Sequence, residues 1–551
     1  MSLIGRWASL GSEAALGVRS IAESRVVHPV RPDRLARALL AAGRYGATPA
    51  TVLAAAAELY PARVALHDEL GALGFGELDD QARGVARGLH RELSVRCGQA
   101  VAIMCRNHRG FVQAAAGAAR LGCSLVPLNT DFAASQLRDV LAREGARAAI
   151  FDEEFAPLFE SAGFTGAKVI AWQESPSDLP TLRDLMATAG QEAPPPEQPG
   201  RIVLLTSGTT GTPKGASRTV ASSGLLALAA GGLVDLGRIR PVPRSGGALL
   251  LAPPLFHLFG VVGMSAGFAL GSPLVLRRRF DPRATLEAVE THHAQVLFAV
   301  PTMLARILAL RGEVQRAHDT TSLRMIVSGA APLPAELAAA VMNEFGDILY
   351  NAYASTEVGS GTLATPSDLR AAPGTVGRPL AGVRIQILDP AGRPLPPRQT
   401  GRIFVGSPFA FDGYTGGGGK EVIDGLMSTG DLGHLDEAGR LFIDGRDDDM
   451  ILSGGENVFP QEVEDLLTAR QDVADAAVFG VSDPEFGQRL TALVVRTPGS
   501  ETTAEELRDY VRGHLARFKV PREIEFVDEL PRTSTGKLQR RRLAEAVGDG
   551  R

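Results

Sequence analysis

Through the first four-fifths of the chain, short apolar runs rich in β-forming residues alternate with alanine-rich stretches of helical spacing. Ala100–Met104 reads as a buried strand, and Phe111–Leu121 reads as a helix with small residues along one face. This alternation is typical of an α/β architecture. Because 551 residues exceed what one hydrophobic core usually organises, we expect at least two domains.

The last hundred residues have a different pattern, which predicts a separate α+β module. A helix is expected to begin after Pro460, strands at Ala477–Val481 and Thr491–Arg496, and a second helix at 503–517. Charged residues separate two apolar runs near Arg446–Asp449, and we expect the boundary there. The predicted division is an N-terminal helical extension at 1–50, a main domain at 51–446 and a C-terminal domain at 447–551.

Composition and charge exclude several classes of protein. Apolar residues make up 45% of the chain and charged residues 22%, which excludes wholesale disorder. The net charge of −5 provides no global basic field for nucleic acid. The three cysteines, Cys97, Cys105 and Cys123, form no CxxC pair, so neither a disulfide framework nor a structural zinc site is supported. A reducing cytoplasm fits this cysteine usage best.

The first fifty residues are locally basic, with seven arginines against three acidic residues. Glu13 and Glu23 interrupt the apolar residues, so no secretory signal is predicted. The stretch is compatible with an amphipathic helix on a membrane surface, but we favour a helix packed on the main body. The apolar run Ala248–Leu276 is long enough to span a bilayer, yet Pro253 and Pro254 interrupt it. We expect buried strands and a helix lining an apolar cavity there, and at most peripheral membrane contact.

The strongest local signal is the segment Thr206–Gly215, TSGTTGTPKG, directly after a predicted strand at Ile202–Leu205. Its glycines let backbone amides approach a polyphosphate closely, its hydroxyls can donate hydrogen bonds, and Lys214 supplies positive charge. The spacing is not that of a Walker loop. Composition alone leaves an ordinary glycine-rich turn as the alternative.

This segment resembles the signature of the adenylate-forming superfamily, which contains acyl-CoA synthetases, peptide-synthetase adenylation domains and firefly luciferase. Further segments resemble motifs of the same family and follow in its order. They are the adenine-side loop Ser328–Leu333, the nucleotide motif Tyr350–Glu357, the ribose motif Ser428–Leu432, the hinge Gly445–Asp448 and the C-terminal motif Pro531–Lys537. The resemblance implies a large N-terminal domain of several subdomains and a small mobile C-terminal domain.

The resemblance also implies roles for individual residues, with ATP, Mg²⁺ and coenzyme A as cofactors. Lys537 would stabilise the charge that develops as a carboxylate attacks the α-phosphate. Glu357, with Thr209, would hold Mg²⁺, because a hard cation prefers oxygen ligands. Tyr353 would stack on adenine, and Asp431 would accept hydrogen bonds from the ribose hydroxyls. The residues implied to contact ATP or CoA are Thr206, Ser207, Gly208, Thr209, Thr210, Gly211, Lys214, Gly329, Ala330, Ala331, Asn351, Tyr353, Ala354, Ser355, Thr356, Asp431, Arg446, Asp448, Gly454 and Gly455.

The chain departs from the family at Ala354, where the family usually has glycine. The added methyl group is expected to narrow the acyl pocket or shift the nucleotide. Lysine usage is also unusual, since only five of the 57 basic residues are lysines. Lys214 and Lys537 fall in nucleotide motifs, where a compact ammonium group serves a phosphate site.

The acid and its acceptor distinguish the subclasses of the family. Amino-acid-activating members have a Phe-Asp pair that binds the substrate amine, whereas the matching pair here is Phe256-His257, which disfavours an amino acid substrate. His257 resembles a gating residue of acyl- and aryl-CoA ligases, with a buried core histidine as the alternative. Gly454 and Gly455 would let the backbone approach the pantetheine of CoA. Because no carrier-protein segment follows the last motif, we expect the acceptor to be free CoA or a separate carrier protein.

Together these features predict an ATP-dependent acyl-CoA synthetase for a small-molecule carboxylic acid. We expect a medium- or long-chain fatty acid, because Leu255–Ala269 is apolar and lacks a charged selector. The alternatives are an aryl- or natural-product-acid–CoA ligase, or an acyl-AMP ligase that loads a separate carrier protein. A non-catalytic nucleotide-binding or carrier-docking module is a hypothesis of another class, and the intact Lys537 and Glu357 argue against it.

Overall fold

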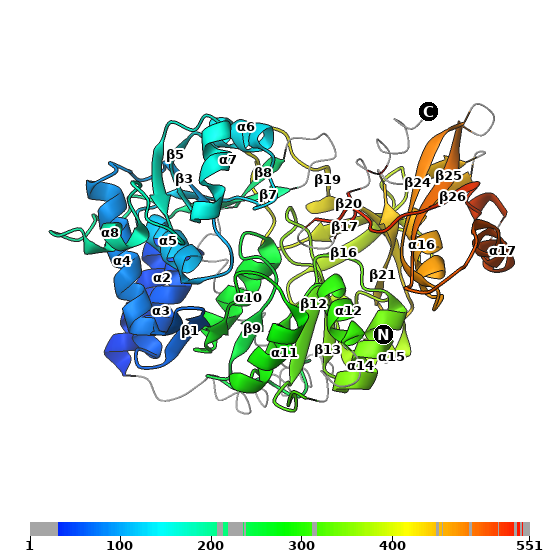
Figure 1. The fold of residues 1–551 in the computed structure, drawn as a ribbon, viewed down its shortest axis with the longest axis horizontal. Helices are drawn as coiled ribbons and strands as arrows, with labels where there is room; N and C mark the ends of the chain where they lie inside the picture. Colours follow the sequence, from blue (N-terminus) through cyan, green and yellow to red (C-terminus); the bar gives the residue numbers. More distant parts are fainter. Residues whose placement is uncertain are drawn as a thin grey trace.

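The computed structural model of the chain describes residues 31–206, 213–218, 235, 238–310, 317–447, 451–453, 456–483, 487–515, 517–533, 537–539 and 543. These residues form two large sheets with their helices, a smaller antiparallel sheet, and a C-terminal module with a mixed sheet of its own (Figure 1). The predicted fold class, a large α/β N-terminal part followed by a smaller α+β part, is therefore confirmed.

The first large sheet is parallel in its centre and antiparallel at one edge. Its strand order is β18-β8-β7-β4-β3-β5-β6, with β8 and β18 antiparallel. The strands are β3 (Ala100–Met104), β4 (Ser124–Pro127), β5 (Ala146–Phe151), β6 (Ala167–Ile170), β7 (Arg201–Thr206), β8 (Lys214–Arg218) and β18 (Gly413–Tyr414). The strands predicted at Ala100–Met104 and Ile202–Leu205 are confirmed as β3 and within β7.

The second large sheet has the order β15-β14-β13-β12-β11-β9-β10-β1-β2. Its inner strands are parallel, and β14, β15 and β2 are antiparallel at the two edges. The strands are β1 (Val64–Asp68), β2 (Gly71–Gly74), β9 (Leu249–Leu251), β10 (Leu274–Val275), β11 (Val296–Phe298), β12 (Met325–Gly329), β13 (Leu349–Tyr353), β14 (Thr362–Ala364) and β15 (Arg378–Pro379).

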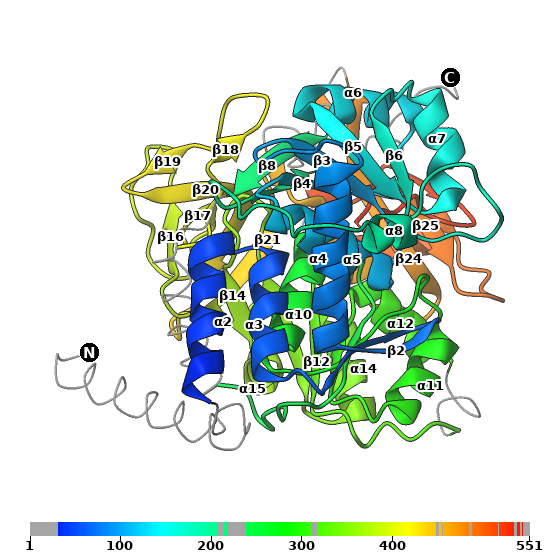
Figure 2. The same ribbon diagram turned by 90° about the vertical axis from the view of Figure 1, so that its left-hand side faces the viewer.

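Helices cover both sheets and fill the space between them (Figures 1 and 2). The inner layer includes α3, α4, α5 and α10, while α6 and α7 cover the outer face of the first sheet, and α11, α12 and α14 that of the second. The helices of this part are α2 (Pro32–Tyr45), α3 (Pro49–Leu59), α4 (Phe75–Arg91), α5 (Arg109–Arg120), α6 (Ala134–Glu144), α7 (Ala156–Ser161), α8 (Leu182–Ala187), α10 (Leu258–Ala269), α11 (Pro282–Thr291), α12 (Pro301–Ala309), α14 (Ala335–Phe345) and α15 (Pro366–Ala371).

The apolar strand runs are continuous because both faces of each large sheet are buried. In β3, Val101 and Ile103 belong to the core between the sheets, whereas Ala102 and Met104 belong to the core under α6 and α7. The small residues of α5 allow close helix packing. A Cβ atom on Gly117 would lie 2.6 Å from Val85 Cγ1 on α4, so glycine is required there.

The smaller antiparallel sheet follows the second large sheet and leads into the C-terminal module. It contains β16 (Arg384–Leu388), β17 (Gly401–Gly406), β19 (Val422–Ile423), β20 (Leu426–Leu435) and β21 (Leu441–Arg446). The module contains α16 (Pro460–Thr468), α17 (Ala504–His514), β22 (Ile451–Ser453), β23 (Glu456–Val458), β24 (Val473–Asp483), β25 (Gly487–Arg496) and β26 (Glu523–Phe526). The two helices and two strands predicted for this module are confirmed as α16, α17, β24 and β25.

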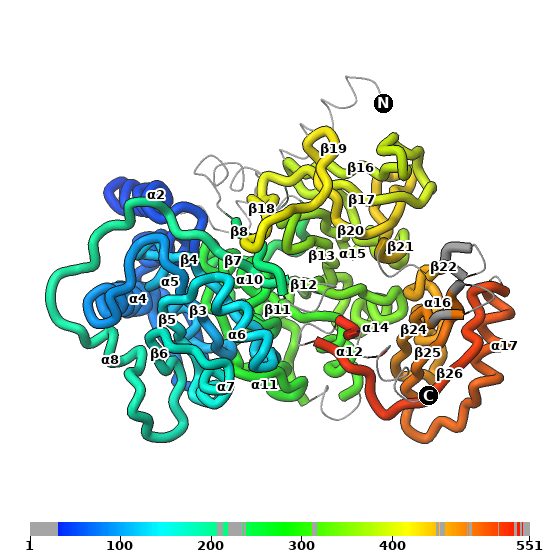
Figure 3. The backbone as a smooth tube through the Cα atoms, turned by 90° about the horizontal axis from the view of Figure 1, so that it is seen from above, coloured from blue at the N-terminus to red at the C-terminus, as the bar shows by residue number. Residues whose placement is uncertain are grey.

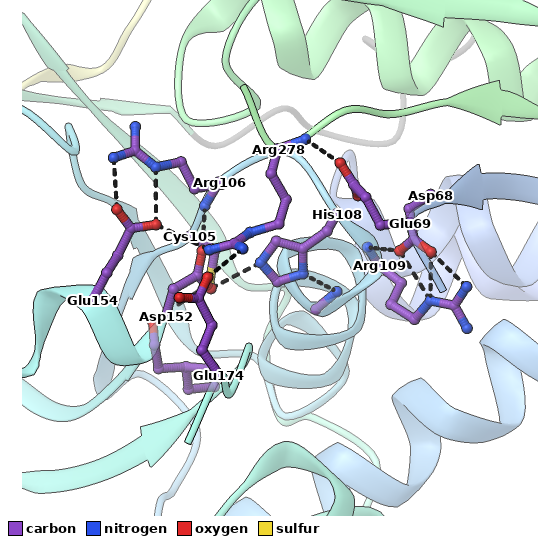
Figure 4. A network of polar contacts seen from close by, with 12 residues as sticks. Asp68, Glu69, Cys105, Arg106, His108, Arg109, Asp152, Glu154, Glu174 and Arg278 are labelled. Atoms are coloured by element: carbon purple, nitrogen blue, oxygen red, sulfur yellow. Dashed lines mark hydrogen bonds and ion pairs between the residues drawn. The ribbon is translucent and has the colours of Figure 1, made fainter. Parts of the chain in front are cut away.

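A polar network lies at the ends of β3 and β5 (Figure 4). Cys105, His108 and Asp152 are buried close enough together to hold a metal ion, but their donor atoms are already used. His108 Nε2 lies 2.8 Å from Asp152 Oδ1, His108 Nδ1 accepts from Gly110 N, and Asp152 Oδ2 accepts from Arg106 N. We interpret this cluster as a structural tie between the strand ends.

No helix among the described residues is long and apolar enough to cross a membrane. The apolar run Ala248–Leu276 instead forms β9, α10 and β10. Buried strands and a helix were the expectation for this run, and the structure confirms it.

Candidate active site

The predicted nucleotide residues gather where parallel strands end at their carboxyl edge, the usual place for a ligand crevice in an α/β sheet. β12 ends at Gly329 and its neighbour β13 ends at Tyr353. A Cβ atom on Gly329 would lie 2.9 Å from the Ala352 carbonyl oxygen, so glycine keeps these strand ends close. Ala330, which follows, has a φ of +67°, a left-handed conformation that turns the adenine-side loop away from the sheet.

A hydrogen bond joins the adenine motif to the ribose motif. Tyr353 Oη donates to Asp431 Oδ2 at 2.5 Å. Asp431 on β20 pairs in register with Arg446 on β21, and Arg446 Nε lies 3.9 Å from Asp431 Oδ1. Burial raises the pKa of Asp431, while Tyr353, Arg446, Lys537 and Lys420 act in the opposite direction. The pairing of β20 with β21 thus places Asp431 beside Arg446, although the two residues are 15 positions apart in the sequence.

One oxygen of the Glu357 carboxylate accepts a hydrogen bond from a tyrosine. Tyr414 Oη donates to Glu357 Oε1 at 2.9 Å, and the Lys214 ammonium lies 5.3 Å from the centre of the Tyr414 ring. Glu357 Oε2 has no hydrogen-bond partner among the described residues, so the carboxylate retains an oxygen for a cation. Thr206 and Lys214 pair across β7 and β8, so the two ends of the phosphate loop lie beside each other.

Arg218 lies behind this carboxylate and was not identified from the sequence. Arg218 Nη2 donates to the Thr356 carbonyl oxygen at 2.6 Å. Burial lowers the pKa of Arg218 to about 10, with Glu357 and Asp412 acting in the opposite direction. Its Nε is buried without a hydrogen-bond partner among the described residues. The guanidinium group therefore provides a fixed positive charge at the base of the Thr356–Glu357 turn.

His257 directly precedes α10, and the loop that contains it is tied to β3. Asn107 Nδ2 donates to the Pro253 carbonyl oxygen at 2.9 Å, and Leu255 N donates to Asn107 Oδ1 at 2.8 Å. Burial lowers the pKa of His257 to about 3, and the Lys537 ammonium adds to this effect. His257 Nε2 is buried without a partner in the described part of the chain. The ring is neutral at ordinary pH and has a free nitrogen for a bound group.

Lys537 belongs to the last described part of the C-terminal module. Figure 3 draws this part of the chain in red, running from the module toward the N-terminal part. Although Lys537 keeps an exposed surface, loss of solvent around its ammonium group lowers its pKa. Arg446 adds to this lowering, whereas Asp431 and Glu357 oppose it. The charge of this one ammonium group therefore reaches Asp431, Glu357 and His257.

Most of the site residues that were predicted from the sequence lie near one another in the structure, but some lie outside the described residues. Gly329, Tyr353, Glu357, Asp431, Arg446 and Lys537 converge, and Ala331, Asn351, Ser355 and Thr356 lie in the same strand ends and turns. Ala354 is exposed and lacks a left-handed backbone, so its methyl group is accommodated without strain. Outside the described residues lie Ser207, Gly208, Thr209, Thr210, Gly211, Asp448, Gly454 and Gly455.

Four residues of the site were missed by sequence reasoning, namely Asn107, Arg218, Tyr414 and Lys420. Lys420 lies near Asp431, so three of the five lysines, Lys214, Lys420 and Lys537, lie around the site. Lysine scarcity is the one signal that could have identified Lys420. The others act through contacts that span many residues and have no local pattern.

Two family models together match most of the chain. The model of the AMP-binding enzyme matches residues 53–415, and that of the AMP-binding enzyme C-terminal domain matches residues 462–537. The chain belongs to the AMP-binding, adenylate-forming enzyme family. The resemblance stated from the sequence motifs is therefore confirmed.

Several relatives of this adenylate-forming enzyme are named as CoA ligases. It is 34% identical to 2-succinylbenzoate–CoA ligase of Geobacillus kaustophilus, with 89% of this chain and 96% of the relative covered. It is 32% identical to feruloyl-CoA synthase of an Amycolatopsis species, with 89% and 97% covered. The solved o-succinylbenzoate CoA synthetase of Bacillus subtilis superposes with a TM-score of 0.77 at 29% identity, covering 89% of this chain and 97% of that one. The predicted enzyme class, an AMP-forming acid–thiol ligase, is confirmed.

Proposed function

We propose that this enzyme activates an aromatic carboxylic acid as its acyl-adenylate and transfers the acyl group to CoA. The observation that supports the reaction is the pair of anchored carboxylates, Asp431 held by Tyr353 at 2.5 Å and Glu357 held by Tyr414 at 2.9 Å, with the charge of the Lys537 ammonium reaching both. This proposal differs from the fatty acid expected from the apolar sequence. The runner-up from the sequence, an aryl-acid ligase, is now preferred.

Aromatic rings at the start of α10 support an aromatic acid. The Phe256 and His257 rings lie 4.5 Å apart, and the Phe259 and Phe298 rings lie 5.3 Å apart. A Cβ atom on Gly329 would lie 3.4 Å from Phe259 Cε2, so the Phe259 ring covers the start of the adenine-side loop. Clustered aromatic rings favour another flat ring over a flexible alkyl chain. The relatives named above act on succinylbenzoate and on a feruloyl acid.

In the first half-reaction, an oxygen of the substrate carboxylate forms a bond to the α-phosphorus of ATP, and the bond to the pyrophosphate oxygen breaks. Two anions approach each other, so the barrier is largely electrostatic. Lys537 supplies a positive charge at that point, while Tyr353 and Asp431 hold the nucleoside end. The neutral His257 ring contributes an unpaired nitrogen and an apolar face toward the acid.

The donor set at Glu357 fits a divalent cation. Its Oε2 is unpaired among the described residues, and Tyr414 orients the carboxylate through Oε1. We assign Glu357, with Thr209, as the Mg²⁺ ligands. When bound, Mg²⁺ would neutralise phosphate charge. Arg218 and Lys214 supply the fixed positive charges on the two sides of this position.

In the second half-reaction, the CoA sulfur attacks the acyl carbonyl carbon, the bond to AMP breaks with its electron pair on the phosphate, and the thiol proton is released. We assign Gly454 and Gly455 as the backbone that admits pantetheine. Lys537 is not needed at this step, because AMP is already a good leaving group.

The test is a pyrophosphate-release assay over matched acids, with the acyl-CoA product identified by mass spectrometry. The panel contains hydroxycinnamic and benzoic acids, straight-chain fatty acids of increasing length, and aromatic amino acids. The expected result is the highest kcat/KM for an aromatic acid, with amino acids lower by orders of magnitude, because an unpaired ammonium in this pocket is costly. A fatty acid or an amino acid as the best substrate would overturn the assignment.

A further inference from the structure

Helix α2 presents an apolar face away from the protein. Ala38, Ala41 and Tyr45 are buried, and they lie on the side that packs against α3. On the opposite side, Leu35, Leu39 and Leu40 are 48%, 63% and 69% exposed, and Ala36 and Gly43 between them are exposed as well. At 100° per residue these five positions fall on one continuous arc of the helix. We call this arc the α2 leucine face.

This arrangement is the reverse of an ordinary surface helix, which turns its polar side to water. Figure 2 shows α2 in dark blue at the outer edge of the molecule, beside α3. Three exposed leucines on one helix form a contiguous patch, and a contiguous exposed apolar patch marks an interaction surface. The burial of α2 against α3 is complete without them, so the leucine face has no part in the fold's own core.

The surroundings of the α2 leucine face are basic. Arg37 bonds to Asp33 and Glu58, and Arg31 bonds to Asp33. Arg34 and Arg44 have no acidic partner among the described residues. The first fifty residues carry seven arginines against three acids, in a chain whose net charge is −5. By the same spacing, Arg44 and Arg37 lie beside Leu40 at one edge of the leucine face, whereas Arg34 lies on the side that packs against α3. The leucine face is therefore bordered by arginines, one of which, Arg44, has no acidic partner among the described residues.

We infer that α2 docks the enzyme on an anionic lipid surface, with the leucine face in the boundary between headgroups and acyl chains and the arginines at the phosphates. Basic amphipathic helices bind membranes in this way, without spanning them. The geometry requires no part of the catalytic site, and it is independent of which acid the enzyme activates.

Charge favours an anionic lipid surface over two other partners for the leucine face, a second copy of the chain and residues 1–30. A second copy docked face to face would bring the Arg37 and Arg44 pairs of the two copies together, with Arg44 lacking an acidic partner among the described residues, and like charges at an interface are costly. Residues 1–30 carry three arginines against two glutamates, so they offer no complementary negative charge either. An anionic bilayer supplies both an apolar layer and negative headgroups.

The experiment is co-sedimentation of the full-length protein with vesicles of phosphatidylcholine alone or mixed with phosphatidylglycerol. The test variant is Leu35→Ser/Leu39→Ser/Leu40→Ser. The matched control is Leu70→Ser/Val422→Ser, which removes two other exposed hydrophobic residues, 61% and 56% exposed, far from α2 in the sequence. Pyrophosphate release with a water-soluble acid, together with the melting temperature, establishes that each variant is folded.

Wild type and control should bind the phosphatidylglycerol vesicles, more weakly at high salt, and bind phosphatidylcholine poorly. The triple variant should bind at least ~10-fold more weakly with unchanged solution activity. Arg44→Gln should weaken binding by roughly 5-fold, whereas Arg34→Gln, on the side that packs against α3, should have a smaller effect. Absence of wild-type binding, or equal binding by the triple variant, would overturn the inference. A dimer by light scattering that the triple variant abolishes, without vesicle binding, would replace the lipid with a second copy.

Discussion

Asp431 and Lys537 interact at the same site, but different parts of the molecule hold them. Asp431 is fixed within the N-terminal part, because β20 pairs in register with β21 and Tyr353 from β13 donates to the carboxylate. The backbone of Lys537 is bonded to Thr533, whose N donates to the Lys537 carbonyl oxygen at 2.8 Å. The neighbouring Arg532 is anchored to Asp475 on β24, within the C-terminal module.

We propose that the difference between these two attachments divides the reaction into its two halves. The nucleotide side is held by sheet register and by buried hydrogen bonds, so it keeps one geometry. The lysine is attached to the module and acts on the N-terminal carboxylates only through the module's position. A group attached in this way can serve one half-reaction and be withdrawn for the other.

The largest effect is expected from removing Lys537, the residue that the C-terminal module contributes to the site. Lys537→Ala should slow acyl-AMP formation by at least ~10²-fold, the usual scale for removing one charge-stabilising group. Lys519→Ala is the matched control, because Lys519 lies in the same module and pairs with Glu462 at 2.6 Å, away from the carboxylates. Pyrophosphate release in single turnover measures both. Similar losses for the two lysines would mean that the effect is structural.

The next largest effect is expected from changes to Asp431 and Tyr353, which are held within the N-terminal part. Asp431→Ala removes the acceptor of the Tyr353 hydroxyl and the partner of Arg446, and should raise KM for ATP by roughly 10- to 100-fold, since hydrogen bonds to a charged group are strong. Tyr353→Phe keeps the ring and removes one donor, so its effect should be smaller. Steady-state kinetics with ATP varied at saturating acid separates the two. An unchanged KM for ATP in both variants would contradict the nucleotide assignment.

A smaller effect is expected at Arg218. Arg218→Met leaves the Thr356 carbonyl without its donor and removes a positive charge beside Glu357, so affinity for Mg·ATP should fall about 10-fold. Arg218→Lys should recover part of this loss by restoring the charge. Isothermal titration with Mg·ATP, rather than turnover, is the measurement. A change in KM for the acid with unchanged nucleotide affinity would place Arg218 at the acyl side instead.

The smallest effect concerns pH and His257. The folded ring has a pKa lowered to about 3 by burial, whereas a histidine in the unfolded chain takes up a proton near pH ~6.5. The unfolded state therefore binds more protons between these values, and stability decreases as pH falls through that range, by at most ~1.4 kcal/mol per unit. His257→Asn should flatten the melting temperature against pH between those limits. An identical slope in the variant would show that the ring is not buried as described.

Sequence reasoning succeeded where the physical constraint is local. β3 was predicted because a run such as Ala100–Met104 buries both faces in a parallel sheet, and α16 because Pro460 suits the first turn of a helix. Tyr353, Asp431 and Lys537 were named because their motifs are contiguous, and their roles stay predictions. Strand order alone does not bring them together, because Tyr353 and Asp431 lie in different sheets and Lys537 lies in the C-terminal module.

The rest depends on contacts between distant segments. Asn107 fixes the His257 loop across 146 residues, and Arg218 reaches Thr356 across 138. Tyr414 was missed because a single tyrosine in a glycine-rich loop has no periodicity. The outward leucine face of α2 was missed because an apolar arc on a helix ordinarily predicts a buried side, and here α2 has an apolar arc on each side.

In the proposed division of the reaction, the C-terminal module positions Lys537 for adenylation only. The most direct test is the second half-reaction in the Lys537→Ala variant. The variant is mixed with presynthesised acyl-AMP and CoA, and acyl-CoA formation is followed in a single turnover beside wild type. If the module brings Lys537 only for adenylation, the rate should stay close to that of wild type, while acyl-AMP formation from ATP is lost. An equal loss in both half-reactions would contradict the account.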